Sequence, residues 1–147
     1  MNKIIGVAHP IEKRFMNRFL LDKKDVFIKP AKCFQFLEPG MLFFFYQSRE
    51  DTGYVGEAII VKINISQDIR RLLSTYKNRN FLSDDEMEEY ISNIERRKTH
   101  RRRYTKVEPR KWMAIELKEI RKYDNPIKPK HFVPIGGRYQ RADSNIK

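Results

Sequence analysis

The sequence predicts a mixed α/β domain built around a small curved β-sheet. A length of 147 residues suits one hydrophobic core rather than two. The 40% hydrophobic and 12% aromatic residues exclude a disordered chain, because disordered chains have too few apolar residues to bury. The spacing of the apolar residues then changes between strand and helix periods in the order β-α-β-β-β-α-α-β-β, which gives the fold class.

The first part of the chain contains a strand, a helix, a second strand and a turn. Residues 3–8 form an apolar strand, which we expect to end before Pro10 because proline restricts the residue that precedes it. A helix follows, with apolar residues at helical spacing: Ile11, Phe15, Met16, Phe19 and Leu20. Residues 25–29 form a short strand that Pro30 ends, and residues 38–40, Glu-Pro-Gly, have the composition of a type II turn.

A hairpin with a charged tip occupies residues 41–63, "MLFFFYQSREDTGYVGEAIIVKI". Its strands are residues 41–46 and 54–63, and Gly53 supplies the positive φ angle that hairpin loops often need. The charged residues lie at the tip because the flanking strands are buried. The end of a buried strand is also a place where a site can form, so three side chains become candidates for binding: Tyr46, Ser48 and Arg49.

Two helices and two strands follow the hairpin. Ser66 is the expected cap of the first helix, and Ser83 with Glu86 forms a capping box for the second. Residues 111–123 alternate as a strand does, with an expected core side at Met113, Ile115 and Leu117. Residues 125–140 form an irregular edge strand with a tight turn. We therefore expect one domain over residues 1–141, with a helical insertion at about 66–100 and a flexible tail at 142–147.

The positive charge is concentrated in the last third of the chain. Residues 1–95 contain 14 Lys and Arg against 14 Asp and Glu, whereas residues 96–147 contain 17 against 5 and so carry the whole net charge of +12. Within that part, residues 96–106, "RRKTHRRRYTK", contain seven basic residues and no acid. Such a segment attracts polyanions through counterion release, although a solvated surface or the dipole of the preceding helix explains part of it equally well.

Several classes of function find no support in the sequence. Cys33 is the only cysteine, and the spacing of Cys33, His9, His100 and His131 is not that of a zinc site, so we expect no metal and no cofactor. No apolar run is long enough to cross a membrane, and the N-terminus does not read as a signal peptide. We expect a cytoplasmic protein that does not bind membranes.

Four segments resemble the PUA-like superfamily of small pseudobarrel domains, which includes the PUA, ASCH, EVE and YTH families: "IIGVAHPIEKRFM", "KDVFIKPA", "PGMLFFFYQSREDTGYVGEA" and "VPIGGRY". Within it, they most resemble an archaeal family described only as a domain of unknown function. The "FYQSR…GYVGEA" pairing is also similar to the EVE pattern of a Tyr-x-Ser strand end followed by Val-Gly. This resemblance implies a PUA-like pseudobarrel with flanking helices, and says less about function.

The resemblance implies a binding cleft on a face of the barrel, which PUA domains use for RNA and EVE and YTH domains use for modified bases. Our main hypothesis is therefore a nucleic-acid-binding domain, for RNA rather than DNA, that is not an enzyme. The cleft at Tyr46, Ser48 and Arg49 would take an unpaired or modified base, with Trp112 as a second stacking ring. The backbone would be held by the basic segment: Arg96, Arg97, Lys98, Arg101, Arg102, Arg103, Tyr104 and Lys106.

Two alternatives stay open. Some ASCH domains hydrolyse acylated nucleosides or RNA, and the ASCH pattern Gly-x-Lys-x-x-x-x-Arg falls on Asp22, Lys24 and Lys29, which keeps only the central lysine. In such a hydrolase, Lys24 and Glu57 would be the catalytic base and acid. A third hypothesis, an interaction module for an acidic protein or ribonucleoprotein partner, accounts for the charge without using the aromatic cleft.

Overall fold

The computed structural model describes residues 3–31, 36–101, 110–129, 133–134 and 137–142. These residues form the strands β1 (Ile4–Glu12), β2 (Val26–Pro30), β3 (Leu42–Ser48), β4 (Gly53–Ser66), β5 (Trp112–Ile127) and β6 (Arg138–Arg141). They also form the helices α1 (Lys13–Leu20), α2 (Ile69–Thr75) and α3 (Asp84–Arg101). The order of elements matches the order predicted from the sequence.

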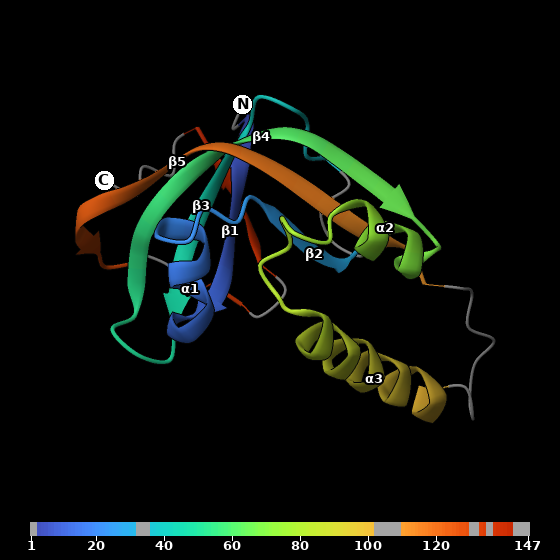
Figure 1. The fold of residues 1–147 in the computed structure, drawn as a ribbon. Coiled ribbons are helices and arrows are strands. Elements are labelled where there is room, and N and C mark those ends of the chain that lie inside the picture. The colour runs from blue at the N-terminus through green and yellow to red at the C-terminus, as the bar shows by residue number, and fades with distance from the viewer. Residues whose placement is uncertain (1–2, 32–35, 102–109, 130–132, 135–136, 143–147) are drawn as a thin grey trace.

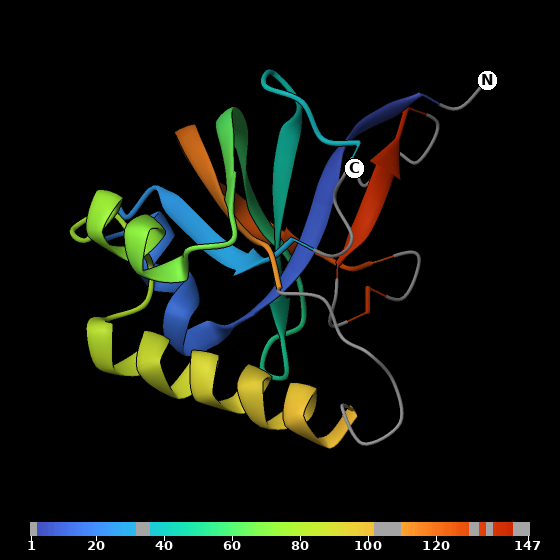
Figure 2. The same cartoon turned by 90° about the vertical axis from the view of Figure 1, so that its right-hand side faces the viewer.

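One curled sheet contains all six strands in the order β2-β5-β4-β3-β1-β6 (Figure 1). The pair of β1 and β3 is parallel and the other pairs are antiparallel. Figure 2 shows α1 and α2 beside β2, and β6 at the far edge beside β1. This is the curved half-barrel with flanking helices that a PUA-like pseudobarrel requires, so the predicted fold class is confirmed.

The hydrophobic residues form two clusters because β3 is buried on both faces. Phe43 and Phe45 belong to the larger cluster, which also takes in side chains of all three helices. Phe44 and Tyr46, which alternate with them, point to the opposite face and belong to a smaller cluster with Ala8, Tyr54 and Val133. The run of four aromatic residues is therefore divided between two packing surfaces, one on each face of β3.

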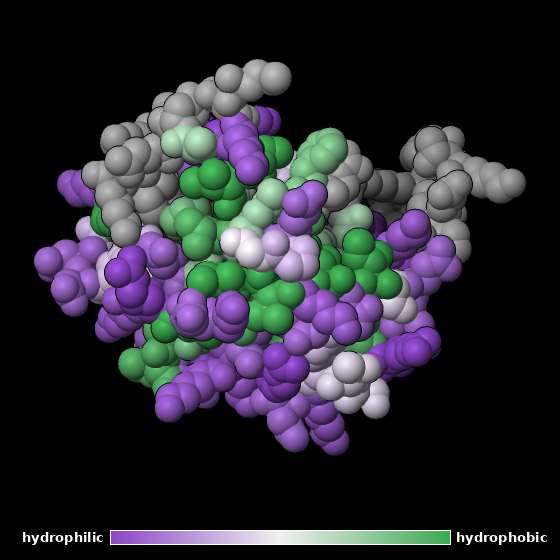
Figure 3. Space-filling view, turned by 90° about the horizontal axis from the view of Figure 1, so that it is seen from above, coloured by the Kyte–Doolittle hydropathy of each residue, from purple (hydrophilic) through white to green (hydrophobic). Residues whose placement is uncertain are grey.

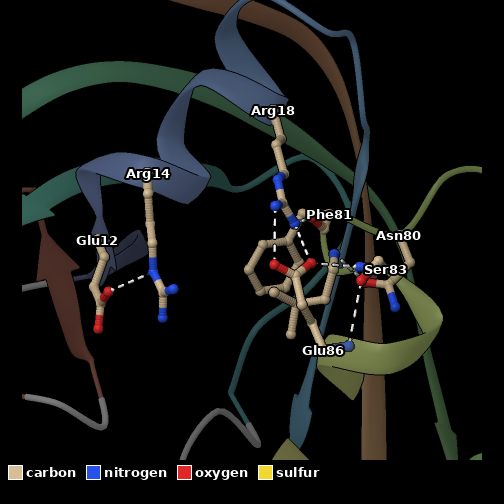
Figure 4. A network of polar contacts seen from close by, with 8 residues as sticks. Glu12, Arg14, Arg18, Asn80, Phe81, Ser83 and Glu86 are labelled. Atoms are coloured by element: carbon tan, nitrogen blue, oxygen red, sulfur yellow. Dashed lines mark hydrogen bonds and ion pairs between the residues drawn. The ribbon is translucent and has the colours of Figure 1, made fainter. Parts of the chain in front are cut away.

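Helix α3 is fixed to α1 by an ion pair, and a capping box forms its N-terminus. Arg18 Nη2 donates to Glu86 Oε2 at 2.9 Å, and Arg18 Nη1 donates to the second carboxylate oxygen and to the Phe81 carbonyl (Figure 4). Ser83 Oγ accepts from the Glu86 N–H at 3.3 Å, while the Glu86 carboxylate accepts from the Ser83 N–H at 2.8 Å. The capping box predicted from the sequence is confirmed, and its Glu86 carboxylate also pairs with Arg18 of α1.

Strand β1 is longer than predicted. It continues through Pro10 to Glu12, so Ile11 belongs to the strand and α1 begins only at Lys13. The partner β6 ends opposite Ala8, which leaves β1 paired on one side only at Pro10. A strand edge is where proline is tolerated, because its missing N–H is not needed there.

Two turn predictions were wrong in detail. Asp68, not Ser66, caps α2, since its carboxylate accepts from the Arg71 N–H at 3.2 Å. At the hairpin tip the positive φ angles belong to Arg49 (71°) and Asp51 (46°), and Gly53 already lies in β4 opposite Gln47. The turn at residues 38–40 is as predicted, with a φ of 96° at Gly40.

The face seen from above in Figure 1 mixes apolar and hydrophilic side chains. Figure 3 shows green apolar groups separated by purple hydrophilic ones over its centre. Val61 and Ile65 of β4 are 42% and 54% exposed. Apolar surface divided in this way does not form one continuous patch of the kind that marks a binding site.

Candidate nucleic-acid interface

The parallel pairing of β1 and β3 builds a cleft at the ends of these strands. Pro10 lies opposite Tyr46 and Glu12 opposite Ser48. A hollow of about 380 Å³ opens there, lined by Pro10, Glu12, Tyr46, Ser48, Arg49, Thr52 and Val133. The three cleft residues predicted from the sequence thus line the same hollow, which we call the Tyr46 cleft.

Tyr46 is a fixed wall of this cleft. Its side chain is buried, and its ring meets the ring of Tyr54 edge to face with centroids 5.4 Å apart. Gln140 in turn donates to the Tyr54 hydroxyl at 3.2 Å, and burial raises the pKa of Tyr54. Because these neighbours hold the ring, a ligand would meet a preformed surface.

The charged residues at the rim of the cleft are joined by ion pairs. Glu12 Oε1 lies 3.4 Å from Arg49 Nη1, and Glu12 Oε2 accepts from Arg14 Nε at 3.0 Å (Figure 4). Lys13 donates to Asp51 at 2.6 Å, and this hydrogen bond lowers the pKa of the Asp51 carboxyl. The contacts tie the hairpin tip to the start of α1, so the rim has a defined shape.

Arg49 has a strained backbone conformation at the rim of the cleft. Its φ angle of 71° lies in the left-handed region, which disfavours residues that carry a Cβ atom. Its side chain is 80% exposed. Such conformations occur in tight turns, as at this hairpin tip, and are also found at functional sites.

A second and larger hollow lies on the other side of Glu12. It measures about 390 Å³ and is bounded by β1, β2, α1 and α3. Aromatic rings form much of its wall: His9, Phe15, Phe27, Phe81 and Tyr90. Polar side chains also line it: Glu12, Arg14, Glu86, Glu89 and Asn93. We call it the aromatic groove; the sequence analysis did not predict it.

Trp112 is separated from Tyr46. Its side chain is 2% exposed, belongs to the larger core cluster, and meets Tyr90 edge to face at 5.9 Å. Tyr46 lies in the smaller cluster on the other face of the sheet. The structure does not bring the two rings together as a stacking pair, and the buried Trp112 has no free face to offer to a base.

Lys24 and Glu57 make separate contacts. Lys24 Nζ donates to the Asn78 carbonyl at 2.8 Å. Glu57 Oε1 accepts from Tyr123 at 2.7 Å and from Arg121 at 3.0 Å. Burial, followed by the hydrogen bond to Glu57, raises the pKa of Tyr123. These contacts account for both side chains structurally, and the hydrolase hypothesis gains no geometric support from them.

The basic segment lies largely outside the described residues. Arg96 is exposed, and its guanidinium donates to the side chain of Asn93 one turn earlier. Helix α3 continues to Arg101, so the first six residues of the basic segment belong to this helix. The side chains of Arg97, Lys98 and Arg101 lie outside the described part, as do Arg102, Arg103, Tyr104 and Lys106.

None of the helices among the described residues is long and apolar enough to cross a membrane. No group of three or more His, Cys, Asp or Glu side chains in the described part of the chain is arranged to hold a metal ion.

Comparison with known proteins relates both the fold and the sequence to other chains. An ASCH protein from Zymomonas mobilis has a similar crystal structure, with a TM-score of 0.68 over 95% of this chain and 90% of that chain, at 17% identity. A variant of the same protein gives a TM-score of 0.62 over 87% of this chain and 77% of that chain, also at 17% identity. At such low identity the similarity shows the fold alone, which resembles the fold of this ASCH protein.

The sequence relatives are more specific. An uncharacterised protein of Methanocaldococcus jannaschii is 37% identical over 103 residues, which cover 70% of this chain and 92% of the relative. The family described as "Domain of unknown function (DUF365)" matches residues 4–142, from the first residue of β1 to just beyond β6. The chain therefore belongs to the DUF365 family.

Proposed function

We propose that the protein binds RNA, with an unpaired base in the Tyr46 cleft and the phosphate backbone on the basic residues 96–106. The observation that carries this proposal is the meeting of Tyr46, Ser48 and Arg49 in one hollow at the ends of β1 and β3. A nucleobase needs an apolar wall and a few polar groups at its edge, and the cleft offers both.

The polar groups of the cleft favour a base edge that accepts hydrogen bonds. Ser48, Thr52 and Arg49 all carry hydrogen-bond donors. Arg49 is the strongest of them, because a guanidinium can donate two parallel bonds to a carbonyl and a ring nitrogen, as it does with guanine. Glu12 holds Arg49 through an ion pair, which orients the guanidinium before a ligand arrives.

The net charge supports a polyanionic ligand. All of the +12 comes from residues 96–147, and the chain before them is neutral. Charge gathered in one segment attracts phosphates to that segment and gives binding a strong salt dependence. Charge alone attracts any nucleic acid, whereas the cleft would favour one with an unpaired base.

A titration by fluorescence anisotropy tests the proposal. Labelled single-stranded RNA, structured RNA and DNA of matched sequence are compared at two salt concentrations. We expect tighter binding of single-stranded RNA, with part of the affinity kept at the higher salt. Equal affinity for all of these polyanions, lost entirely at the higher salt, would contradict a cleft that reads bases.

Two triple variants test whether the basic segment contributes more to RNA affinity than positive charge elsewhere on the protein. Changing Arg101, Arg102 and Arg103 to Ala should weaken binding equally for all sequences and flatten the salt dependence. The matched control changes Lys62, Lys77 and Lys118 to Ala; all three are exposed, and the substitution removes the same charge elsewhere. An equal loss of affinity in both triple variants would remove the basic segment from the interface.

A further inference from the structure

We propose that the aromatic groove binds a second base of the same RNA strand, one that carries an exocyclic amino group. This inference rests on the proposed function and names the ligand more closely: a single-stranded unit of at least two nucleotides. Pro10 and Glu12 line both hollows, so the groove and the Tyr46 cleft share a wall. A strand that places one base in the cleft therefore has the next hollow beside it.

The walls of the groove suit a flat aromatic ligand. Tyr90 is partly exposed and is held edge to face by the buried Trp112 at 5.9 Å. Arg14 lies over the Phe15 ring, 4.3 Å from its centroid, so a planar guanidinium is already stacked at the rim. Single-stranded nucleic acids bind proteins through base stacking on such rings and guanidinium planes.

The floor of the groove holds a neutral histidine. His9 Nδ1 lies 3.0 Å from the Pro10 carbonyl, and because a carbonyl can only accept, Nδ1 carries the hydrogen. Burial, together with the nearby charge of Lys29, lowers the pKa of His9 to about 3. The ring is thus uncharged at neutral pH and forms part of an apolar, aromatic floor with Phe27, whose ring lies 4.6 Å away.

Carboxylates on the rim select the kind of base. Glu89 of α3 is exposed and forms no ion pair with any residue that the structure describes, and Glu12 accepts at both of its oxygens yet keeps further lone pairs. Carboxylates accept from amino groups such as the N4 group of cytosine. Uracil carries a carbonyl oxygen at the same position, which a carboxylate repels. The groove therefore favours cytosine or adenine over uracil.

The groove leads toward the basic segment. Asn93 lines it, and Asn93 accepts a hydrogen bond from Arg96, the first residue of that segment. Arg14 lines the groove as well and pairs with Glu12. The guanidinium groups of Arg14 and Arg96 thus lie beside the groove, where they can pair with the phosphates of a bound nucleotide.

Short labelled RNAs measure this selectivity. Binding of an all-uridine single strand is compared with binding of strands in which one cytidine replaces uridine at each position in turn. We expect one position to raise the affinity by about tenfold, as a base-specific contact of this kind does. A 2-aminopurine at that position should lose fluorescence on binding, because it stacks on the rings of the groove.

Two matched variants of α3 assign the selectivity to the groove. In Glu89→Gln the side chain can donate as well as accept, so the preference for cytidine should fall to less than about threefold. Asp85→Asn removes the same charge from an exposed residue of the same helix that does not line the groove, and should keep the preference. Both variants lose one negative charge, so any general gain in affinity cancels in the comparison.

The outcomes separate the two proposals. Equal binding of the all-uridine strand and of every cytidine-containing strand would overturn the second base site and leave the proposed function standing. A 2-aminopurine signal that is unchanged on binding would do the same. A preference that survives the combined change of Glu89→Gln and Glu12→Gln, which removes both rim carboxylates, would equally remove the groove from recognition. If no single-stranded RNA binds, both proposals fail together.

Discussion

Arg18 and Glu86 join the first helix of the protein to the first turn of its longest helix, with Nη2 and Oε2 2.9 Å apart. The two residues are 68 positions apart in the chain. Glu86 also completes the capping box with Ser83, so one carboxylate caps the start of α3 and fixes the place of this helix in the fold. The aromatic groove lies between α1 and α3, and its width therefore depends on this pair.

Removing the Glu86 side chain should destabilise the protein. Glu86→Ala loses the capping box and leaves Arg18 without its carboxylate, so we expect a loss of at least about 1 kcal/mol from the cap. Glu86→Gln keeps the reach to the Ser83 N–H and should lose less. Urea denaturation measures both. The control is Glu88→Ala, which lies in α3 like Glu86 and breaks an exposed ion pair with Arg70 of α2; it should have a much smaller effect.

The same pair should make stability depend on pH in acid. The Arg18 guanidinium lowers the pKa of the Glu86 carboxyl from 4.5 to about 2. The unfolded chain therefore takes up a proton at higher pH than the folded chain, and the contribution of Glu86 is present above about pH 4.5 and lost as the pH falls toward 2. The difference in unfolding free energy between the wild type and Glu86→Gln should shrink across this window. A difference that stays constant would show that the ion pair contributes nothing to stability.

Gly6 should tolerate no side chain. A Cβ atom at this position would lie 2.1 Å from the Leu42 carbonyl oxygen, which belongs to the backbone of the partner strand. Gly6→Ala must separate β1 from β3, and we expect a loss of about 3 kcal/mol in thermal or urea unfolding. Because β1 and β3 also carry the Tyr46 cleft, RNA affinity should fall with it. Gly53→Ala, whose Cβ would lie 3.0 Å from the Ile127 carbonyl oxygen, should cost less.

The hairpin was predictable from the sequence because its run of aromatic residues fits only a strand that is buried on both faces. Four consecutive aromatic residues must bury both faces of a strand, and the following charges must then lie at its end. That reasoning placed Tyr46, Ser48 and Arg49 at one strand end, where the structure shows a single hollow. The opposite wall of the Tyr46 cleft, formed by Pro10 and Glu12, was not predicted, because Pro10 suggested that β1 ends before it. Only the sheet order shows that Pro10 sits on an unpaired edge, where the strand continues to Glu12.

The aromatic groove could not be predicted from the sequence. His9, Phe27 and Tyr90 come from a strand, a second strand and a helix that no local pattern relates. Each of them reads as an ordinary core position, since periodicity shows which residues are apolar but not which of them meet. Their meeting depends on the docking of α3 through Arg18 and Glu86, a contact between distant parts of the chain.

Arg49 allows folding and binding to be tested separately. Its φ angle of 71° suits glycine, so Arg49→Gly should be more stable than Arg49→Ala by about 1 kcal/mol. Both variants lack the guanidinium, and both should lose RNA affinity to the same extent if Arg49 contacts the base. Thermal unfolding and anisotropy measured on the two proteins give the comparison. If affinity follows stability from Ala to Gly, Arg49 acts by shaping the hairpin; if affinity is equally low in both while stability differs, the guanidinium itself binds the ligand.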